Sequence, residues 1–205
     1  MCDVAVGCEY RSGGYSCAHA YLLATVERIV ATRKPERIFD LGCGNGAVAN
    51  RLSKYAPVTG IDISVSGVQV AQQSFPHLNI HTGSVYDDLA RRYGNFPIVV
   101  SLEVVEHLFD PRAYAKRLFE LVEEGGVAVV STPYHGYWKN LALALTGKFD
   151  AHFSALWDGG HIKFWSIRTL GILLKDAGFE RIDFVRAGRV PVLAKSMIAI
   201  AQKPL

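Results

Sequence analysis

The stretch Asp40-Leu-Gly-Cys-Gly-Asn-Gly46 decides the fold. It stands where a short apolar segment, residues 37–41, gives way to a helical pattern that begins at Ala47. Glycines suit a tight strand-to-helix turn in which a ligand must approach the backbone closely. The free N–H groups at the start of the following helix favour an anionic group. The motif therefore predicts a ligand-binding loop at the carboxyl end of the first strand.

Strand-like apolar runs alternate with amphipathic helical patterns on both sides of this loop. The expected strands cover residues 37–41, 58–63, 78–81, 96–102, 127–131, 181–186 and 193–202. The expected helices cover residues 18–31, 47–55, 64–74, 87–92, 111–123, 138–145 and 166–177, two of them capped by Ser64 and Ser166. Such alternation requires a mostly parallel sheet with helices on both faces, and the short final connection makes an antiparallel hairpin. The prediction is a doubly wound α/β fold with a seven-stranded sheet, built as one domain over residues 1–205.

The composition narrows the classes of partner. Half of the 205 residues are hydrophobic, and the formal net charge is +3, with lysines and arginines scattered along the chain. A modest, scattered charge does not suggest a nucleic-acid-binding face. Cys2, Cys8, Cys17 and Cys43 form no C-x-x-C pair, so no zinc or redox site is expected. Without a leader pattern or an apolar run of about 20 residues, we expect a cytoplasmic protein with no integral membrane contact.

Two acidic residues near the glycine loop indicate the cofactor. If the ligand is S-adenosylmethionine (SAM), its methionine carboxylate suits the helix start, and Asp40 can hold its ammonium group directly or through water. Asp62 ends the second strand, where an acid can accept hydrogen bonds from a ribose diol. The alternative for Asp62 is a plain helix cap.

The spacing Gly42-x-Gly44-x-x-Ala47 also satisfies the dinucleotide-binding pattern, so an NAD(P)-dependent oxidoreductase is an alternative. Two features favour SAM. Asp40 stands two residues before the first glycine, where its charge would face a pyrophosphate. The chain also ends in a predicted hairpin rather than in a substrate domain.

At these residues the chain resembles the class I SAM-dependent methyltransferases, which are Rossmann-like. The matching segments follow one another in the right order at residues 40–46, 60–64, 102–107 and 124–133. Within that class the chain is most similar to the ubiquinone-biosynthesis O-methyltransferase group. The run Glu-x-x-Glu-His-x-x-Asp-Pro, from Glu103 to Pro111, is the most specific match. The resemblance implies SAM as cofactor, S-adenosylhomocysteine (SAH) as product and a small-molecule methyl acceptor.

The resemblance also implies a set of cofactor-binding residues. They are Asp40, Gly42, Cys43, Gly44, Gly46, Asp62, Ile63, Ser84, Val85, Leu102 and Glu103. The family usually has an acid after the third strand to meet the adenine amine, whereas this chain has Ser84, with Asp87 close enough to substitute. No Asn/Asp-Pro-Pro-Tyr motif follows the fourth strand, so amide or nucleobase N-methylation is less expected.

Catalysis requires a base more than an activated leaving group, because a sulfonium already leaves readily. The protein must align the acceptor hydroxyl with the methyl carbon and remove its proton. A phenol with a pKa of about 10 calls for a base tuned toward neutrality, most often histidine. The candidates are His107, His161 and His152, and the alternative for His107 is a helix-start histidine that bonds to backbone.

Glu103, Glu106 and His107 fall within one helical turn, so a divalent metal is conceivable there. The prediction nevertheless assigns no metal, because pairing of Glu106 with Arg112 or with a helix end would explain the same residue.

Residues 134–165 are rich in aromatic side chains and histidines. We expect this insert to be a lid that walls a pocket for an aromatic or amphipathic acceptor; the alternative is a packed cap with exposed histidines. Its helix at residues 138–145 could also touch a membrane surface. Tyr10, Arg11 and Tyr15 precede the first helix, where an N-terminal segment could fold over the cofactor.

The sequence thus predicts a small-molecule O-methyltransferase that uses a histidine base. An RNA or protein methyltransferase is an alternative that would need a basic face. A module that binds SAM without transferring its methyl group is a further alternative. The sequence predicts neither the acceptor nor an oligomeric state.

Overall fold

A computed structural model of the chain describes residues 10, 12–15, 19–153, 156–157 and 159–205. The described residues form a seven-stranded sheet in the order β3-β2-β1-β4-β5-β7-β6. The strands are β1 (Ile38–Leu41), β2 (Val58–Asp62), β3 (Asn79–Thr82), β4 (Phe96–Leu102), β5 (Val122–Pro133), β6 (Arg181–Ala187) and β7 (Ser196–Gln202). β7 is antiparallel to both of its neighbours and the other pairs are parallel, so the predicted fold class is confirmed.

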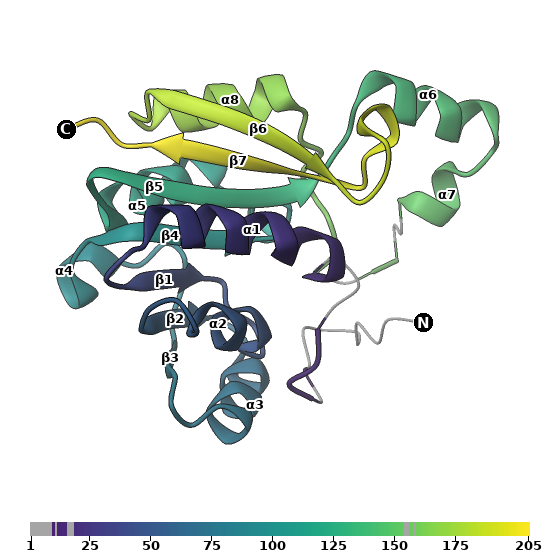
Figure 1. The fold of residues 1–205 in the computed structure, drawn as a ribbon. Helices are drawn as coiled ribbons and strands as arrows, with labels where there is room; N and C mark the ends of the chain where they lie inside the picture. Colours follow the sequence, from purple (N-terminus) through teal and green to yellow (C-terminus); the bar gives the residue numbers. More distant parts are fainter. Residues whose placement is uncertain (1–9, 11, 16–18, 154–155, 158) are drawn as a thin grey trace.

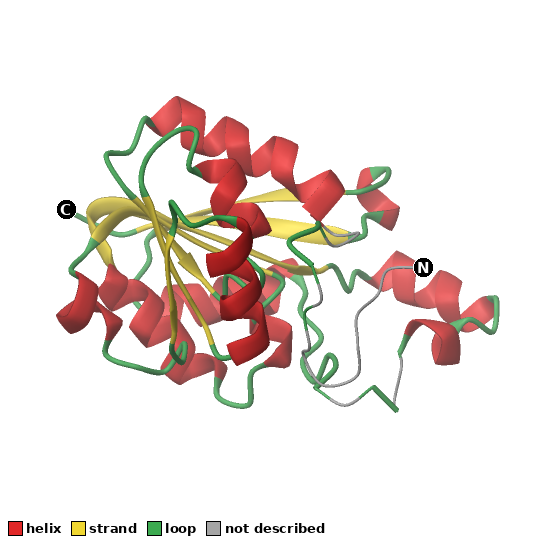
Figure 2. Cartoon of the chain, turned by 90° about the horizontal axis from the view of Figure 1, so that it is seen from below, coloured by secondary structure: helices red, strands yellow, loops and turns green. Residues whose placement is uncertain are grey.

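Helices cover both faces of this sheet (Figures 1 and 2). They are α1 (His19–Arg33), α2 (Ala47–Leu52), α3 (Val65–Ser74), α4 (Leu89–Tyr93), α5 (Pro111–Leu121), α6 (Tyr137–Leu145), α7 (Phe149–His152) and α8 (Ile167–Asp176). Two short 3-10 helices are η1 (Val105–His107) and η2 (Pro191–Leu193). None of the described helices is both long and apolar enough to cross a bilayer.

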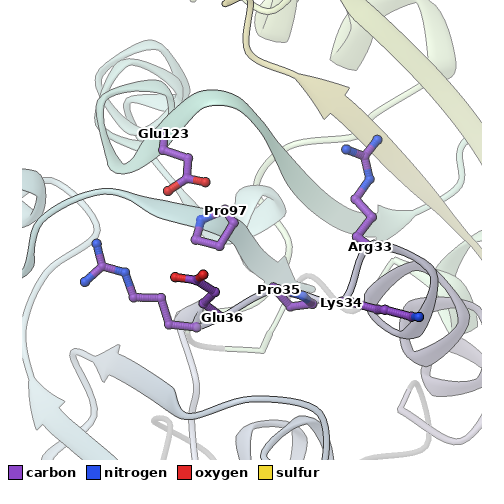
Figure 3. Close-up of a pocket in the computed structure, with 7 residues that line it drawn as sticks. Arg33, Lys34, Pro35, Glu36, Pro97 and Glu123 are labelled. Atoms are coloured by element: carbon purple, nitrogen blue, oxygen red, sulfur yellow. The ribbon is translucent and has the colours of Figure 1, made fainter.

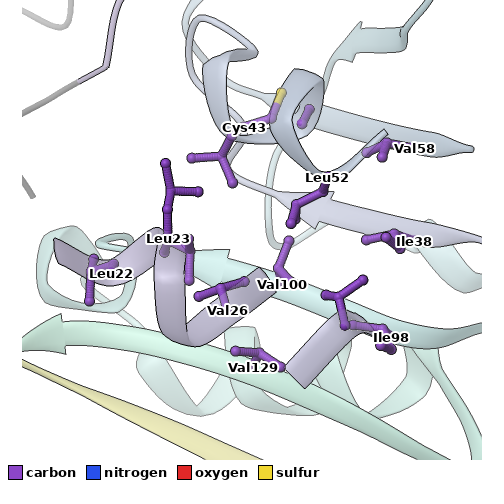
Figure 4. Packing of buried hydrophobic residues seen from close by; sticks show 14 of the residues in the cluster. Leu22, Leu23, Val26, Ile38, Cys43, Leu52, Val58, Ile98, Val100 and Val129 are labelled. Atoms are coloured by element: carbon purple, nitrogen blue, oxygen red, sulfur yellow. The ribbon is translucent and has the colours of Figure 1, made fainter. Parts of the chain in front are cut away.

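The hydrophobic core lies in two layers, one on each side of the sheet. The first packs α1, α2 and α3 against the sheet, with Val26 of α1 beside Val100 and Val129 (Figure 4). The second packs α4, α5 and α8 against the opposite face. Each fully buried aliphatic side chain of this kind contributes about 1.5–3 kcal/mol, so the sheet is a rigid support for the loops at its edge.

The boundary between α5 and β5 differs from the prediction. The helix ends at Leu121 instead of Glu123, and the strand begins at Val122 instead of residue 127. Val122 is buried and pairs with Phe96, and the register between β4 and β5 shifts just after this pair. Gly125, with φ 74°, lies within this irregular part of the strand and does not stop the helix. A tertiary pairing therefore overrides the local helix-stop signal.

Smaller differences concern the C-terminal third. β7 begins at Ser196 rather than residue 193, because η2 occupies the connection, and the one-turn helix α7 was not predicted. The predicted caps are confirmed: Ser64 accepts a hydrogen bond from the Gly67 N–H, and Ser166 forms a reciprocal capping box with Thr169. That residues 1–205 make up one domain stays a prediction.

Candidate active site

The glycine loop between β1 and α2 uses backbone angles that favour glycine. Gly42, Gly44 and Gly46 have φ values of 86°, 52° and 75°. A Cβ atom at Gly42 would lie 2.5 Å from Val104, and one at Gly46 would lie 2.8 Å from the Cβ of Ala71. The loop is therefore fixed both by its backbone angles and by close contact with neighbouring elements.

Asp62 ties this loop to the end of β2. Its carboxylate accepts hydrogen bonds from the Gly44 N–H at 2.7 Å and the Ser64 N–H at 2.8 Å. Burial raises the pKa of Asp62, and these two donors partly offset the rise. Because Ser64 is the N-cap of α3, Asp62 is not a plain helix cap, and the spare lone pairs of its oxygens can accept further hydrogen bonds.

Asp40 lies at the end of β1 and is 2% exposed. Its Oδ2 atom has no hydrogen-bond partner among the described residues. Burial, together with the charge of Asp62, raises the pKa of Asp40 to about 7. A buried carboxyl group in this state gains most from a cationic ligand, which would favour its charged form.

The other predicted cofactor residues surround the same strand ends. The Cys43 side chain is buried in the core, where burial raises its thiol pKa well above the ordinary value, so Cys43 can serve the loop only through its backbone. Ile63 is 74% exposed, and Leu102 is buried. The Ser84 N–H donates to Asp87 at 2.9 Å, so Asp87 stabilises the turn that Ser84 and the half-buried Val85 form.

Glu103 follows β4 in a left-handed conformation, with φ 57°. Its backbone N–H donates to the Oγ atom of Ser131, and its carboxylate accepts from Ser131 at 2.9 Å and from Ser196 at 3.4 Å. Burial raises the pKa of Glu103 to about 7 despite these hydrogen bonds. Three elements, β4, β5 and β7, thus hold this acid in place.

Glu106 in η1 is 1% exposed, and neither of its carboxylate oxygens has a hydrogen-bond partner among the described residues. The predicted alternative of an ion pair with Arg112 is therefore wrong. Burial raises the pKa of Glu106 well above its ordinary value, and the nearby charge of Glu103 raises it further. The Nε2 atom of His161 lies 4.0 Å from Oε1 of Glu106.

Glu106, His107 and His161 can each offer one ligand atom, and the three atoms lie within 4.8 Å of one another. One carboxylate and two imidazoles are a donor set that suits Mn²⁺, Fe²⁺, Co²⁺ or Zn²⁺. The sequence suggested Glu103, Glu106 and His107 as possible ligands. In the structure Glu103 bonds to Ser131 instead, and His161 takes its place in the set. The prediction assigned no metal, whereas the geometry could hold one.

His161 comes after β5 in the chain, and backbone hydrogen bonds hold its segment against η1. The N–H groups of Ile162 and Lys163 both donate to the backbone oxygen of Glu106, at 2.9 and 3.0 Å. The His107 Nδ1 atom lies 2.8 Å from the backbone oxygen of Gly159. Because a carbonyl oxygen only accepts, this nitrogen carries the proton, and in the neutral ring the lone pair lies on Nε2.

The electrostatic setting keeps His161 neutral. Burial lowers the pKa of His161 to about 4, and the charges of His107, His152 and Lys139 act in the same direction. At neutral pH the ring is therefore uncharged, and a ring nitrogen has a lone pair that can bind a metal. His152, the third candidate base, is exposed in α7, with its ring centroid 5.9 Å from that of His135. It is not part of the pair formed by His107 and His161.

The insert at residues 134–165 is only partly attached to this site. Trp165 is buried and donates to the backbone oxygen of Val105 at 3.3 Å. By contrast, α6 has no buried residue, and Trp138 is 69% exposed. Figure 1 shows α6 and α7 extending away from the sheet beside the β6–β7 connection. A closed aromatic lid therefore stays a prediction.

Tyr10, Ser12 and Gly14 from the N-terminal segment contact the glycine loop. A Cβ atom at Gly44 would lie 2.6 Å from the Tyr10 hydroxyl oxygen, so the Tyr10 ring lies against the loop. The Asn45 amide donates to the backbone oxygens of Ser12 and Gly14, at 2.7 and 2.8 Å. Asn45 was missed in the sequence, although its place inside the glycine motif was a signal. Arg11 lies outside the described residues.

A separate groove of about 500 Å³ lies at the opposite end of the strands (Figure 3). It is lined by Arg33, Lys34, Pro35, Glu36, Arg37, Pro97 and Glu123. Ligands of open α/β sheets bind at the carboxyl ends of the strands, and these residues lie at the amino ends. We therefore place the candidate site at the glycine loop and η1.

A family model for a methyltransferase domain matches residues 16–183. A ubiquinone biosynthesis O-methyltransferase of Psychrobacter arcticus is 28% identical over 174 residues, which cover 80% of this chain and 66% of that relative. The chain thus spans about two thirds or less of the length of the curated relatives that it matches.

Solved structures show the same fold. The methyltransferase domain of bacterial CtHen1-C has a TM-score of 0.70 at 20% identity, covering 90% of this chain and 97% of that one. The N-methyltransferase NodS of Bradyrhizobium japonicum, in complex with SAH, has a TM-score of 0.65 at 15% identity, covering 90% of this chain and 87% of that one.

Proposed function

Because the chain belongs to the methyltransferase-domain family, whose model matches residues 16–183, we propose that it transfers a methyl group from SAM to a hydroxyl group of a small aromatic acceptor. The observation that carries this proposal is the buried, unpartnered carboxyl group of Glu106 beside two histidines at the end of β4. A cofactor loop alone would fit several reactions, whereas this cluster provides groups that can handle a hydroxyl proton.

On the cofactor side, Asp40 and Asp62 each bind one part of SAM. Asp40 neutralises the ammonium group of SAM, and the spare lone pairs of Asp62 accept the ribose hydroxyls. The exposed side chain of Ile63 offers an apolar surface to adenine, next to the turn of Ser84 and Val85. These assignments fit the orphaned Oδ2 of Asp40 and the exposure of Ile63, which would otherwise be unfavourable.

On the acceptor side, His107 is the base in this proposal. Its Nδ1–H is held by the backbone oxygen of Gly159, so Nε2 is free to take the proton of the acceptor hydroxyl. His161 and Glu106 would hold a divalent cation together with His107. Such a cation would lower the pKa of a coordinated hydroxyl and orient two neighbouring hydroxyls. The two roles are alternatives for His107, because its single free lone pair on Nε2 either removes the proton of the acceptor hydroxyl or binds the cation.

The names of the relatives support the acceptor class in this proposal. Proteins named ubiquinone biosynthesis O-methyltransferase match 70–80% of this chain at 27–32% identity. We therefore propose a phenol or catechol acceptor. We also propose, as expected from the sequence, that the protein is cytoplasmic.

The test is a calorimetric titration of the purified protein with SAH, followed by methyl transfer from SAM to catechol. We expect micromolar SAH binding that Asp62→Ala abolishes, and no binding of NADH. Transfer is followed by mass spectrometry as a methyl ether. Binding of NADH in place of SAH would identify the glycine loop as a dinucleotide-binding loop. If SAH binds but the methyl group is transferred only to nitrogen acceptors, the proposal of O-methylation is wrong.

A further inference from the structure

Helix α6 presents an apolar face to solvent. Tyr137, Trp138, Leu141 and Leu145 recur at helical spacing, so their side chains lie on one side of the helix. They are 92%, 69%, 48% and 78% exposed, and α6 contains no buried residue. A helix this short gains little stability from its own hydrogen bonds, and most helical stability comes from packing of the apolar face. We therefore expect this face to pack against a partner.

The exposed apolar surface continues onto the neighbouring elements. Both η2, in the β6–β7 connection, and α7 contact α6, and Figure 1 shows η2 and α6 side by side. Val190, Val192 and Leu193 are exposed in the connection, and Phe149 is exposed in α7. We call these side chains, together with the four of α6 named above, the α6 surface. A contiguous exposed apolar surface marks an interaction site, unlike apolar side chains that are exposed singly.

The positive charge of the protein is concentrated around the α6 surface. Residues 134–153 and 186–196 contain five of the 22 lysines and arginines but only one of the 19 acids. The rest of the chain, with 17 basic and 18 acidic residues, is close to neutral. The five cations are Lys139, which is half-buried, and the exposed Lys148, Arg186, Arg189 and Lys195. An apolar surface bordered by cations is complementary to an anionic lipid bilayer.

The α6 surface lies at the edge of the sheet that holds the candidate active site. The last residues of β5 and β6, Pro133 and Ala187, both pair with Ser196 at the start of β7. Because β4 and β5 are parallel, these ends lie at the same edge as the end of β4. A bilayer in contact with the α6 surface would therefore lie on the edge that carries η1 and the glycine loop.

We propose that the α6 surface docks the protein on an anionic lipid bilayer, with α6 lying in the plane of the interface. Tyr137 and Trp138 would lie at the level of the headgroups, where phenol and indole rings are favoured, and Leu145 would enter the acyl region. Lys148 and Arg189 would bind the headgroup phosphates. The docking does not depend on which acceptor the enzyme methylates.

Sedimentation of the purified full chain with sucrose-loaded vesicles tests the docking. Vesicles of phosphatidylcholine alone are compared with vesicles that contain about 30% phosphatidylglycerol. We expect the protein to bind the anionic vesicles at least about tenfold more tightly, and added salt should reduce this preference. SAH affinity and the thermal midpoint of each variant described below report whether it is folded.

The first variant combines Trp138→Ser with Leu145→Ser, which removes apolar side chains from the α6 surface without changing its charge. It should weaken binding to the anionic vesicles at least about tenfold. The matched control combines Ile172→Ser with Leu205→Ser, because both residues are exposed apolar side chains outside the α6 surface. We expect this control to bind the vesicles as the unchanged protein does.

The second variant combines Lys148→Gln with Arg189→Gln, which removes two cations and keeps the apolar side chains. It should weaken binding to the anionic vesicles about 10- to 30-fold and leave binding to phosphatidylcholine unchanged. The control, Arg28→Gln with Lys175→Gln, makes the same change of charge at exposed residues of α1 and α8. We expect its binding to remain close to that of the unchanged protein.

Equal binding to neutral and anionic vesicles, or binding that both double variants of the α6 surface retain, would overturn the proposal. Sedimentation velocity without vesicles tests for a second copy of the chain as the occupant. A dimer that Trp138→Ser with Leu145→Ser dissociates, combined with no binding to vesicles, would assign the surface to self-association and overturn the lipid docking. Because the vesicles contain no methyl acceptor, each of these results is separate from methyl transfer to catechol.

Discussion

The imidazole rings of His107 and His161 meet edge to face, with their centroids 4.9 Å apart. His107 precedes β5 in the chain, and His161 lies near the end of the insert that follows β5. The contact depends on backbone hydrogen bonds to η1, so it is a property of the fold and not of a local motif. The buried carboxyl group of Glu106 completes the cluster and makes it suited to bind a cation or a proton.

The first prediction concerns metal binding. We expect Mn²⁺ to bind the purified protein, and His161→Ala to weaken this binding roughly 10- to 100-fold, because it removes one of three donors. His77→Ala is the control, since His77 is an exposed histidine outside the cluster. Calorimetric titration measures both. Equal Mn²⁺ affinity of the His161→Ala variant and the unchanged protein would rule out this site.

The second prediction concerns the base. His107→Ala should lower kcat roughly 100- to 10,000-fold and change SAH affinity much less, because the histidine acts on the acceptor and not on the cofactor. Steady-state kinetics with SAM and the SAH titration separate the two effects. His152→Ala, which alters an exposed histidine outside the pair, should keep most of the turnover. If the His107→Ala and His161→Ala variants both keep full turnover, the base has been assigned to the wrong residues.

The third prediction concerns the glycine loop. Gly46→Ala should destabilise the protein by about 1–3 kcal/mol and weaken SAH binding, because the new Cβ would lie 2.8 Å from the Cβ of Ala71 in α3. The matched control is Gly147→Ala: Gly147 has a similar φ of 64°, but its Cβ position meets no atom within 4 Å. Urea unfolding and SAH titration of both variants measure the difference. Equal losses would show that backbone strain alone matters.

Local signals in the sequence predicted the parts of the structure that are formed locally. The glycine loop follows from residues that are adjacent in the chain, and so do the caps at Ser64 and Ser166. Each depends on a side chain or a φ angle within a few residues, so a short window of sequence contains the cause.

The parts that were missed depend on contacts between distant segments. Val122 belongs to β5 because it pairs with Phe96, and no local feature distinguishes it from a last helical residue. Glu106 does not pair with Arg112, which was one alternative from the sequence, because η1 turns its carboxyl group into the interior. His161 was a candidate base, but its place beside Glu106 depends on two backbone hydrogen bonds that the sequence does not reveal.

The last prediction concerns the dependence of stability on pH. Burial raises the pKa of Asp40 from 3.8 to about 7, so the folded state binds this proton more tightly than the unfolded state. The stabilisation is complete below pH 4 and is lost as the pH rises toward 7. Between pH 5 and pH 8, Asp40 should therefore cost roughly 2–3 kcal/mol of the free energy of unfolding.

Asp40→Asn removes this titration while keeping the shape of the side chain. The free energy of unfolding of this variant, measured in urea without SAM, should fall less between pH 5 and pH 8 than that of the unchanged protein. Glu106 and Glu103 keep their raised pKa values in the variant, so part of the pH dependence must survive. Asp183→Asn, at a site on β6 away from these acids, controls for the change of net charge. Identical pH profiles for Asp40→Asn and the unchanged protein would mean that Asp40 titrates near its ordinary value, and its proposed pairing with the ammonium group of SAM would lose its electrostatic basis.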